Sequence, residues 1–149
     1  MDGLRVDRTI SENSIISLGE EELSVFETPG HTNCSLTFLL NPYRVLFPSE
    51  STGVYIGNGQ MITGMLKSYR ETVASIEINA RYIISPHYGL VPEKAAELYW
   101  DYAANTSNLH KDFVLERIDK GASFEEIIKD YKNEFWSEYV AEEQPVEAF

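Results

Sequence analysis

Short apolar runs separated by turn residues occupy the first half of the chain. They predict strands at residues 5–10, 15–18, 23–27, 35–40 and 44–47. Asn, Gly and Pro supply the intervening turns. The last two runs are apolar at nearly every position of 36–40 and 45–47, which is typical of strands that are buried on both faces of a sheet.

The spacing of apolar residues changes at Ile62. Helical periodicity predicts a helix over 62–78, which is followed by a strand at 81–85. Pro92 stands at a favourable first position for a longer helix that reaches residue 119. Gly121, just beyond that helix, is a typical stop.

The end of the chain contains one more helix signal and an acidic tail. Ser123 followed by Glu126 is the signature of a capping box, which opens a helix through residue 131. We expect residues 1–140 to form a single domain, because no repeat or linker divides them. Residues 141–149 are predicted to be a flexible acidic tail.

The order of these elements predicts an α/β (α+β) fold, with a mixed sheet covered by helices on one face. The helices that follow residue 62 can cover one face of the apolar strands, but too few strands remain to build a second layer over the other face. A large exposed apolar surface is unusual in a monomer. We therefore expect this chain to form a homo-oligomer or to associate with another polypeptide.

Composition narrows the range of partners. The chain has 12 Lys and Arg against 24 Asp and Glu, a formal net charge of -12, which disfavours nucleic acid and anionic membranes as partners. No apolar run approaches the roughly 20 residues of a membrane span. A single cysteine, Cys34, excludes an internal disulfide and favours a cytoplasmic location.

Three potential metal ligands each follow a predicted strand. His31 lies in the turn Thr-Pro-Gly-His-Thr, Glu50 follows Pro-Ser after the strand at 44–47, and His87 follows Ser-Pro after the strand at 81–85. Side chains at strand ends can converge at one edge of a sheet. Two histidines and one carboxylate are a recurring ligand set of hydrolytic metal sites. For either histidine alone, the alternative is a loop imidazole that is hydrogen-bonded to the backbone.

This order of strand, Thr-Pro-Gly-His-Thr, strand pair, acidic residue, helix, strand and Pro-His turn resembles the C-terminal half of the metallo-β-lactamase superfamily, over roughly residues 4–120. The resemblance implies half of a four-layered αββα sandwich. It also implies that a metal-activated water hydrolyses a small-molecule thioester, lactone, β-lactam or phosphoester. His31 would bind the first metal, Glu50 would stand at the bridging carboxylate, and His87 would bind the second metal. Zinc is the favoured ion, with iron and manganese also admissible.

Two features depart from the family pattern. Ser49-Glu50 stands where the family usually has Gly-Asp, so the longer carboxylate can bridge differently. The family also uses an upstream His-x-His-x-Asp-His motif, which a chain with only His31, His87 and His110 cannot supply. We therefore expect part of a metal-dependent hydrolase, inactive by itself. The alternative is a non-catalytic association module that pairs with an N-terminal half or with itself.

Other polar and aromatic features receive ordinary structural interpretations. His110, inside the predicted long helix, is expected to be a solvated surface residue and is left out of the site. The glycines between 53 and 64 indicate either a flap that borders the site or a plain turn. The aromatic residues after position 98 are expected mostly to pack against each other, with some available to line a pocket.

Overall fold

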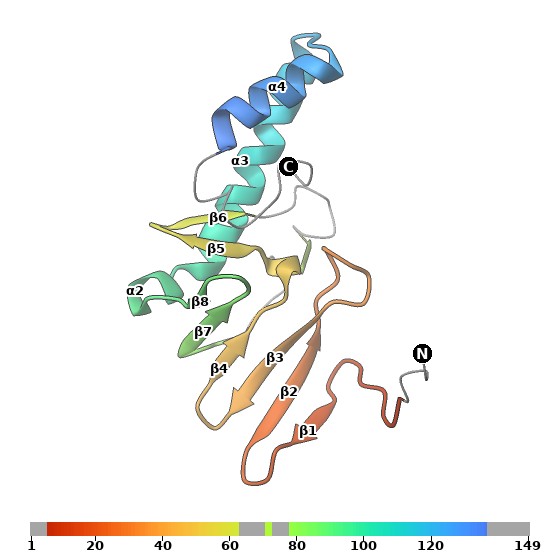
Figure 1. Cartoon of the computed structure of the whole chain (residues 1–149), viewed down its shortest axis with the longest axis vertical. Coiled ribbons are helices and arrows are strands. Elements are labelled where there is room, and N and C mark those ends of the chain that lie inside the picture. The colour runs from red at the N-terminus through yellow and green to blue at the C-terminus, as the bar shows by residue number, and fades with distance from the viewer. Residues whose placement is uncertain (1–5, 63–70, 73–77, 137–149) are drawn as a thin grey trace, which may run out of the picture.

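The computed structural model describes residues 6–62, 71–72 and 78–136 (Figure 1). Six of the described strands form one mixed sheet in the order β1-β2-β3-β4-β7-β8. The parallel pair is β4 with β7, and the other neighbours are antiparallel. The strands are β1 (Ile15–Ser17), β2 (Glu22–Glu27), β3 (Leu36–Asn41), β4 (Val45–Phe47), β7 (Tyr82–Ser85) and β8 (Gly89–Leu90).

The remaining strands form a separate hairpin of β5 (Val54–Gly57) and β6 (Gln60–Ile62). A short 3-10 helix, η1 (Glu50–Thr52), connects β4 to this hairpin. Gly57, Asn58 and Gly59 all have positive φ angles, as a tight hairpin turn requires. The glycine-rich stretch that the sequence left open between flap and turn is therefore an ordered hairpin over these residues.

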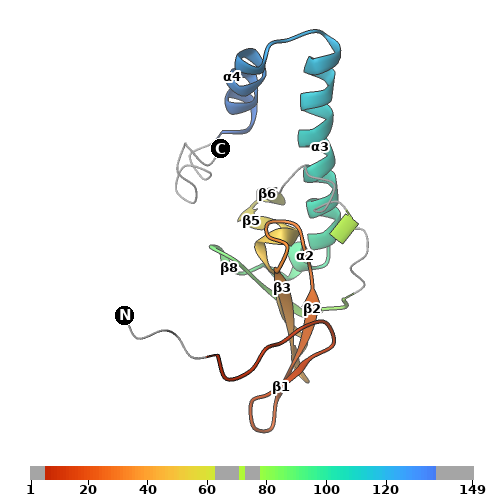
Figure 2. The same cartoon turned by 90° about the vertical axis from the view of Figure 1, so that its right-hand side faces the viewer.

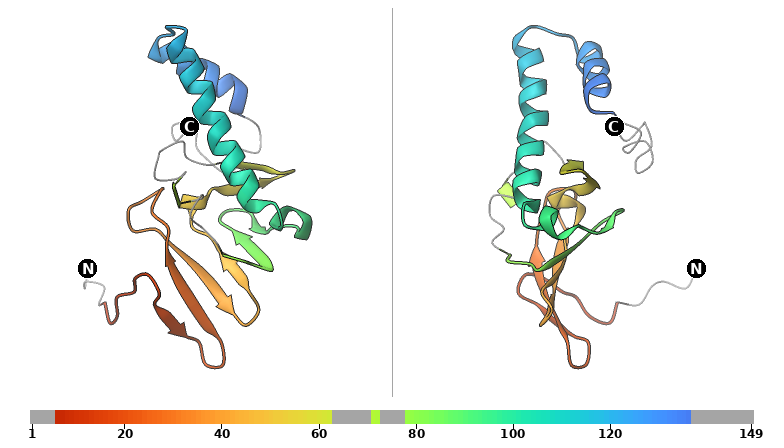
Figure 3. Two further views of the ribbon diagram at one scale, coloured as in Figure 1. Left: turned by 180° about the vertical axis from the view of Figure 1, so that it is seen from behind. Right: turned by 90° about the vertical axis from the view of Figure 1, so that its left-hand side faces the viewer.

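The helices are α2 (Glu93–Ala96), α3 (Tyr99–Asp119) and α4 (Phe124–Phe135). Helix α2 and the first half of α3 lie on one side of the sheet, and the segment before β1 lies on the other (Figures 2 and 3). The second half of α3 extends beyond the sheet and pairs with α4 to form a helical arm. No helix in the described parts of the chain is long and apolar enough to cross a membrane.

Two predicted elements differ from the structure. Residues 6–10 are not a strand; their positions 6–9 are exposed, and the polar Asp7 and Arg8 give this segment little apolar surface to bury. The long helix from Pro92 is interrupted at Leu98, whose φ of -107° and ψ of 8° leave the helical region. Most of the predicted helix at 62–78 and all of the tail at 141–149 lie outside the described residues, although Glu71 and Thr72 are helical.

The two faces of the sheet are buried to different extents. The register places Leu39, Leu46 and Ile83 side by side on the face toward the helices, where they pack with Ala95 and Tyr99 in the core. All five are at most 8% exposed.

The opposite face, called here the outer face, consists of Leu23, Val25, Leu36, Phe38, Leu40, Val45 and Phe47. Only Val25 is fully buried, and the other six are half-buried. The nearly continuous apolar pattern of β3 and β4 therefore corresponds to one buried face and one that is only half-buried in the described part of the chain.

Helix α4, the second helix of the arm, begins at a capping box. The Ser123 side chain accepts a hydrogen bond from the Glu126 N–H at 3.3 Å, and the Ser123 N–H donates to the Glu126 carboxylate at 2.8 Å. Gly121 has a φ of 77°, which confirms it as the residue that ends the preceding helix. Hydrogen bonds to its carboxylate, first from the Ser123 backbone N–H and then from the Ser123 side chain, lower the pKa of Glu126 below its ordinary value.

Replacing the cap tests this part of the fold. Ser123→Ala should lower the free energy of unfolding by about 1 kcal/mol, because it removes an N-cap acceptor. The exposed Asn133→Ala in the same helix is the control and should change it by no more than about 0.5 kcal/mol. Urea denaturation at neutral pH measures both variants. An unchanged midpoint for Ser123→Ala would show that the arm does not depend on this cap.

Candidate metal centre

The first candidate ligand, His31, lies in the loop between β2 and β3. Its backbone N–H donates a hydrogen bond to Ser51 Oγ at 2.9 Å. The preceding residue must be small here, since a Cβ on Gly30 would lie 3.0 Å from the Cβ of Ser51. The Thr-Pro-Gly-His turn is thus packed directly against η1.

The second candidate, Glu50, is the first residue of η1. Ser49 caps this short helix, because its side chain accepts from the Ser51 N–H at 3.3 Å. Gly53 ends it with a φ of 93° and donates its N–H to the Glu50 carbonyl oxygen at 3.0 Å. Both ends of the helix that carries Glu50 are therefore fixed by local hydrogen bonds.

The third candidate, His87, is in the tight turn between β7 and β8. Its φ of 61° is in the left-handed region, which His tolerates better than most residues but which still carries strain. The next residue, Tyr88, packs edge-on against the buried ring of Tyr55, with the ring centroids 4.8 Å apart. This contact holds the turn against the β5–β6 hairpin.

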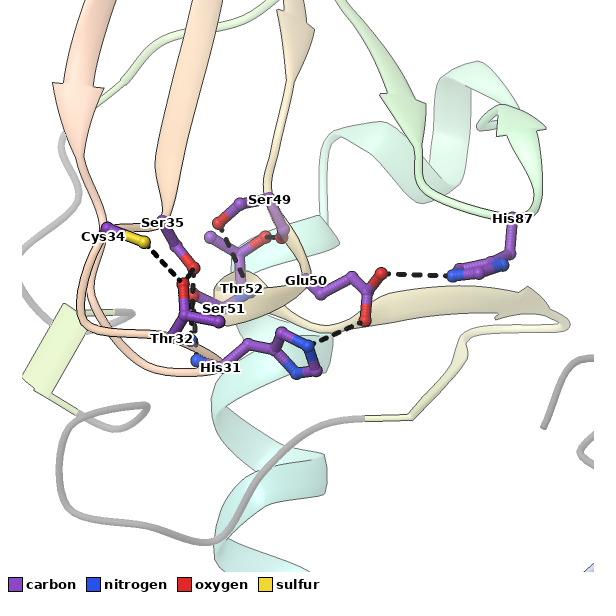
Figure 4. Close-up of polar contacts among 9 residues, drawn as sticks. All are labelled: His31, Thr32, Cys34, Ser35, Ser49, Glu50, Ser51, Thr52 and His87. Atoms are coloured by element: carbon purple, nitrogen blue, oxygen red, sulfur yellow. Dashed lines mark hydrogen bonds and ion pairs between the residues drawn. The ribbon is translucent and has the colours of Figure 1, made fainter. Parts of the chain in front are cut away.

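The three side chains meet at one place (Figure 4). His31 Nε2 lies 3.5 Å from Glu50 Oε2, and His87 Nε2 lies 3.2 Å from Glu50 Oε1. The side chains of His31, Glu50 and His87 are 52%, 35% and 38% exposed. The predicted convergence of His31, Glu50 and His87 is thus present, and each oxygen of the carboxylate faces a different imidazole.

These separations can be compared with those of metal ligands. Two donor atoms that each lie about 2.0–2.2 Å from a tetrahedral zinc ion are roughly 3.3–3.6 Å apart. The measured 3.5 Å and 3.2 Å are close to that range. Imidazole and carboxylate are donor types that divalent cations accept. Within the described ranges, however, no group of three or more His, Cys, Asp or Glu side chains forms a ready metal cage.

Buried hydroxyl groups connect the start of the His31 loop to strand β3 and to the cap of η1. Thr28 Oγ1 is 3.0 Å from Thr37 Oγ1 and 3.1 Å from Ser49 Oγ. Thr28, Thr37 and Ser51 are at most 1% exposed. This network was missed in the sequence, where the only signal was the presence of Ser and Thr beside the ligands and at an otherwise apolar strand position.

A second set of buried hydrogen bonds joins segments that lie next to Glu50 and His87 in the sequence. The fully buried Tyr99 donates its hydroxyl to the Gly53 carbonyl at 3.0 Å, and the Tyr55 N–H donates to Ser85 Oγ at 2.9 Å. Burial raises the pKa of Tyr99, and hydrogen bonds with Ser85 and Thr52 offset part of that rise. Tyr99 is therefore a neutral structural donor that joins α3 to the end of η1.

His110 lies outside this site, as expected, but the prediction that it is solvated is wrong. It is 6% exposed, its Nδ1 is 3.0 Å from the Tyr131 hydroxyl, and its ring is 4.3 Å from that of Phe135. Burial raises the pKa of Tyr131 to about 12. His110 is thus a packing residue between α3 and α4, and it borders a cavity of about 310 Å³ that Phe135 and Met61 also line.

Comparisons with known proteins find similarity among solved structures. No protein-family model and no curated protein matches the chain. A metallo-beta-lactamase superfamily protein from the archaeon Sulfolobus tokodaii is similar in structure, with 28% sequence identity and a TM-score of 0.49. The match covers 62% of this chain and 37% of that chain, so it spans little more than a third of the archaeal protein. The mixed sheet and the helices confirm the α/β (α+β) class.

Proposed function

We propose that this chain contributes His31, Glu50 and His87 to the divalent-metal centre of a metallo-β-lactamase-like hydrolase. The observation that carries the proposal is the position of the Glu50 carboxylate between two imidazoles, at 3.5 Å and 3.2 Å. We favour zinc as the ion, and His and carboxylate ligands would also accept iron or manganese.

The three side chains have separable roles in this proposal. Glu50 presents one oxygen toward each histidine, so it is suited to bridge two ions, with His31 on one and His87 on the other. Divalent ions here would lower the pKa of water and polarise the carbonyl or phosphoryl group of a substrate. We therefore infer an ester, thioester, lactone or phosphoester of a small molecule as the substrate class.

The proposed centre needs ligands from elsewhere. Each ion would receive one imidazole and one carboxylate oxygen from this chain, whereas a catalytic zinc site typically has three protein ligands. The sequence has only one further histidine, His110, which is committed to packing against Tyr131 and Phe135. A segment that carries the His-x-His-x-Asp-His motif would complete the centre, and catalysis by this chain alone should be weak.

The outer face supports a second candidate function, a non-catalytic association module. Its half-buried apolar side chains come from β2, β3 and β4, and the register places them on the face opposite Leu39 and Leu46, which pack against α2 and α3. Covering a few hundred Å² of such surface would contribute on the order of several kcal/mol. The two functions are compatible if the partner that covers this face is an N-terminal half that brings the missing ligands.

Zinc binding tests the first proposal. Calorimetric titration of zinc into the full chain at neutral pH should give binding that His31→Ala and His87→Asn each weaken at least tenfold, because each loses one ligand. Asn is chosen at position 87 because it tolerates a positive φ. Cys34→Ser is the control, since Cys34 is an exposed potential ligand in the same loop as His31. Equal affinities in wild type and both histidine variants would contradict the proposal.

The second prediction concerns turnover. With saturating zinc, the isolated chain should hydrolyse generic lactone, thioester and phosphodiester substrates slowly or not at all, because its ligand set is incomplete. Steady-state assays with each substrate class measure this. Robust turnover that disappears in His31→Ala and His87→Asn would show that three ligands suffice or that a dimer assembles a full site.

The third prediction concerns association. Sedimentation at micromolar concentration should show species heavier than 17.0 kDa, and Phe38→Glu on the outer face should shift them toward the monomer. Ile118→Glu is the matched control, because Ile118 is a 54% exposed apolar residue on the helical arm. A wild-type chain that remains a 17.0 kDa monomer and binds no hydrophobic dye would contradict association through this face.

A further inference from the structure

We infer that Ser51 is a positioning residue that sets the distance between His31 and Glu50. The inference rests on the proposed metal centre and assigns a role to a side chain that is not itself a candidate ligand. Ser51 directly follows Glu50 in η1, so it belongs to the same rigid turn as the carboxylate. It is 0% exposed, and its hydroxyl therefore acts within the protein rather than on solvent.

The hydroxyl of Ser51 binds the backbone of the loop that carries His31. Ser51 Oγ accepts the His31 N–H at 2.9 Å, a normal hydrogen-bond length. One side chain from the Glu50 helix thus fixes the main chain that carries the first imidazole. The link is from side chain to backbone and does not involve the His31 ring.

Direct packing strengthens this link. A Cβ on Gly30 would lie 3.0 Å from Ser51 Cβ and 3.3 Å from both Ser51 Oγ and the Ser51 carbonyl oxygen. A second connection lies alongside, because the capping hydroxyl of Ser49 is 3.1 Å from that of Thr28, at the start of the same loop. The loop therefore contacts η1 at two points on either side of Pro29.

The contact between the His31 and Glu50 side chains is too weak to fix the distance between them. The His31 and Glu50 side chains are 52% and 35% exposed, and water screens the attraction in a pair this open. The part-buried hydrogen bond from the His31 N–H to the hydroxyl of the fully buried Ser51 limits the loop more strongly. We assign the preorganisation of the two ligands to Ser51 rather than to the attraction between them.

Cobalt binding provides the test, because Co²⁺ substitutes for zinc and its visible absorption reports ligand geometry. The full chain, Ser51→Ala and Ser35→Ala are titrated with Co²⁺ at neutral pH. Ser35 is the matched control: its hydroxyl bonds to Thr32 in the same loop at 2.7 Å but does not contact the His31 N–H. Ser51→Ala should weaken cobalt binding about tenfold, the low end for groups that orient ligands. It should also change the absorption of the saturated site, whereas Ser35→Ala should resemble wild type.

The possible failures are distinguishable. If Ser51→Ala matches wild type in affinity and absorption while His31→Ala loses binding, the positioning role is wrong and the proposed metal centre stands. If wild type binds no cobalt, both are wrong.

A measurement on the unmodified chain covers the case in which Ser51→Ala does not fold. Hydrogen exchange at the His31 amide should be slow although the residue is exposed, and zinc should slow it further. Exchange at the rate of a free loop amide, with and without zinc, would overturn the inference.

Discussion

The parallel pairing of β4 with β7 is the constraint on which the candidate site depends. Val45 pairs with Tyr82 and Leu46 with Ile83, so both strands run toward the same edge of the sheet. Strand β2 has the same direction, because it is antiparallel to β3, which is antiparallel to β4. The loops after β2, β4 and β7 therefore leave the sheet at one edge, and each carries one candidate ligand.

Local hydrogen bonds and backbone conformation hold the three candidate ligands at this edge of the sheet. Glu50 is held in a capped 3-10 turn, His31 is held by its backbone, and His87 occupies a turn with a positive φ. The hydroxyls beneath them are buried, whereas the ligand side chains remain open to water. Buried groups that hold exposed donor side chains in place are expected at a ligand-binding site. At such a site the fixed position of the donors matters more than the strength of the contacts between them.

The sequence predicted the parts of the fold that follow from local pattern. Strands β2, β3, β4 and β7 were located within one or two residues, because their apolar runs end in clear turn signals. The capping box at Ser123 was recognised because its two partners are three residues apart. The convergence of His31 and His87 around Glu50 was also expected, since all three follow strands.

What the sequence missed depends on contacts between distant segments. The burial of His110 comes from α4, which brings Tyr131 and Phe135 onto its ring, and no pattern within α3 contains that information. The interruption at Leu98 has no Pro or Gly to mark it. The role of Ser51 arises from the close approach of a loop twenty residues earlier in the chain. Such roles become visible only when the topology is known.

The central claim is that divalent ions bind at Glu50, each between one carboxylate oxygen and one of the two imidazoles. Crystals of the full chain grown with zinc, and measured at the zinc absorption edge, test it most directly. The account predicts anomalous density within bonding distance of Glu50 and of Nε2 of His31 or His87, with the carboxylate still between the two rings. Zinc density only at other residues, or a Glu50 side chain turned away from both histidines, would contradict it.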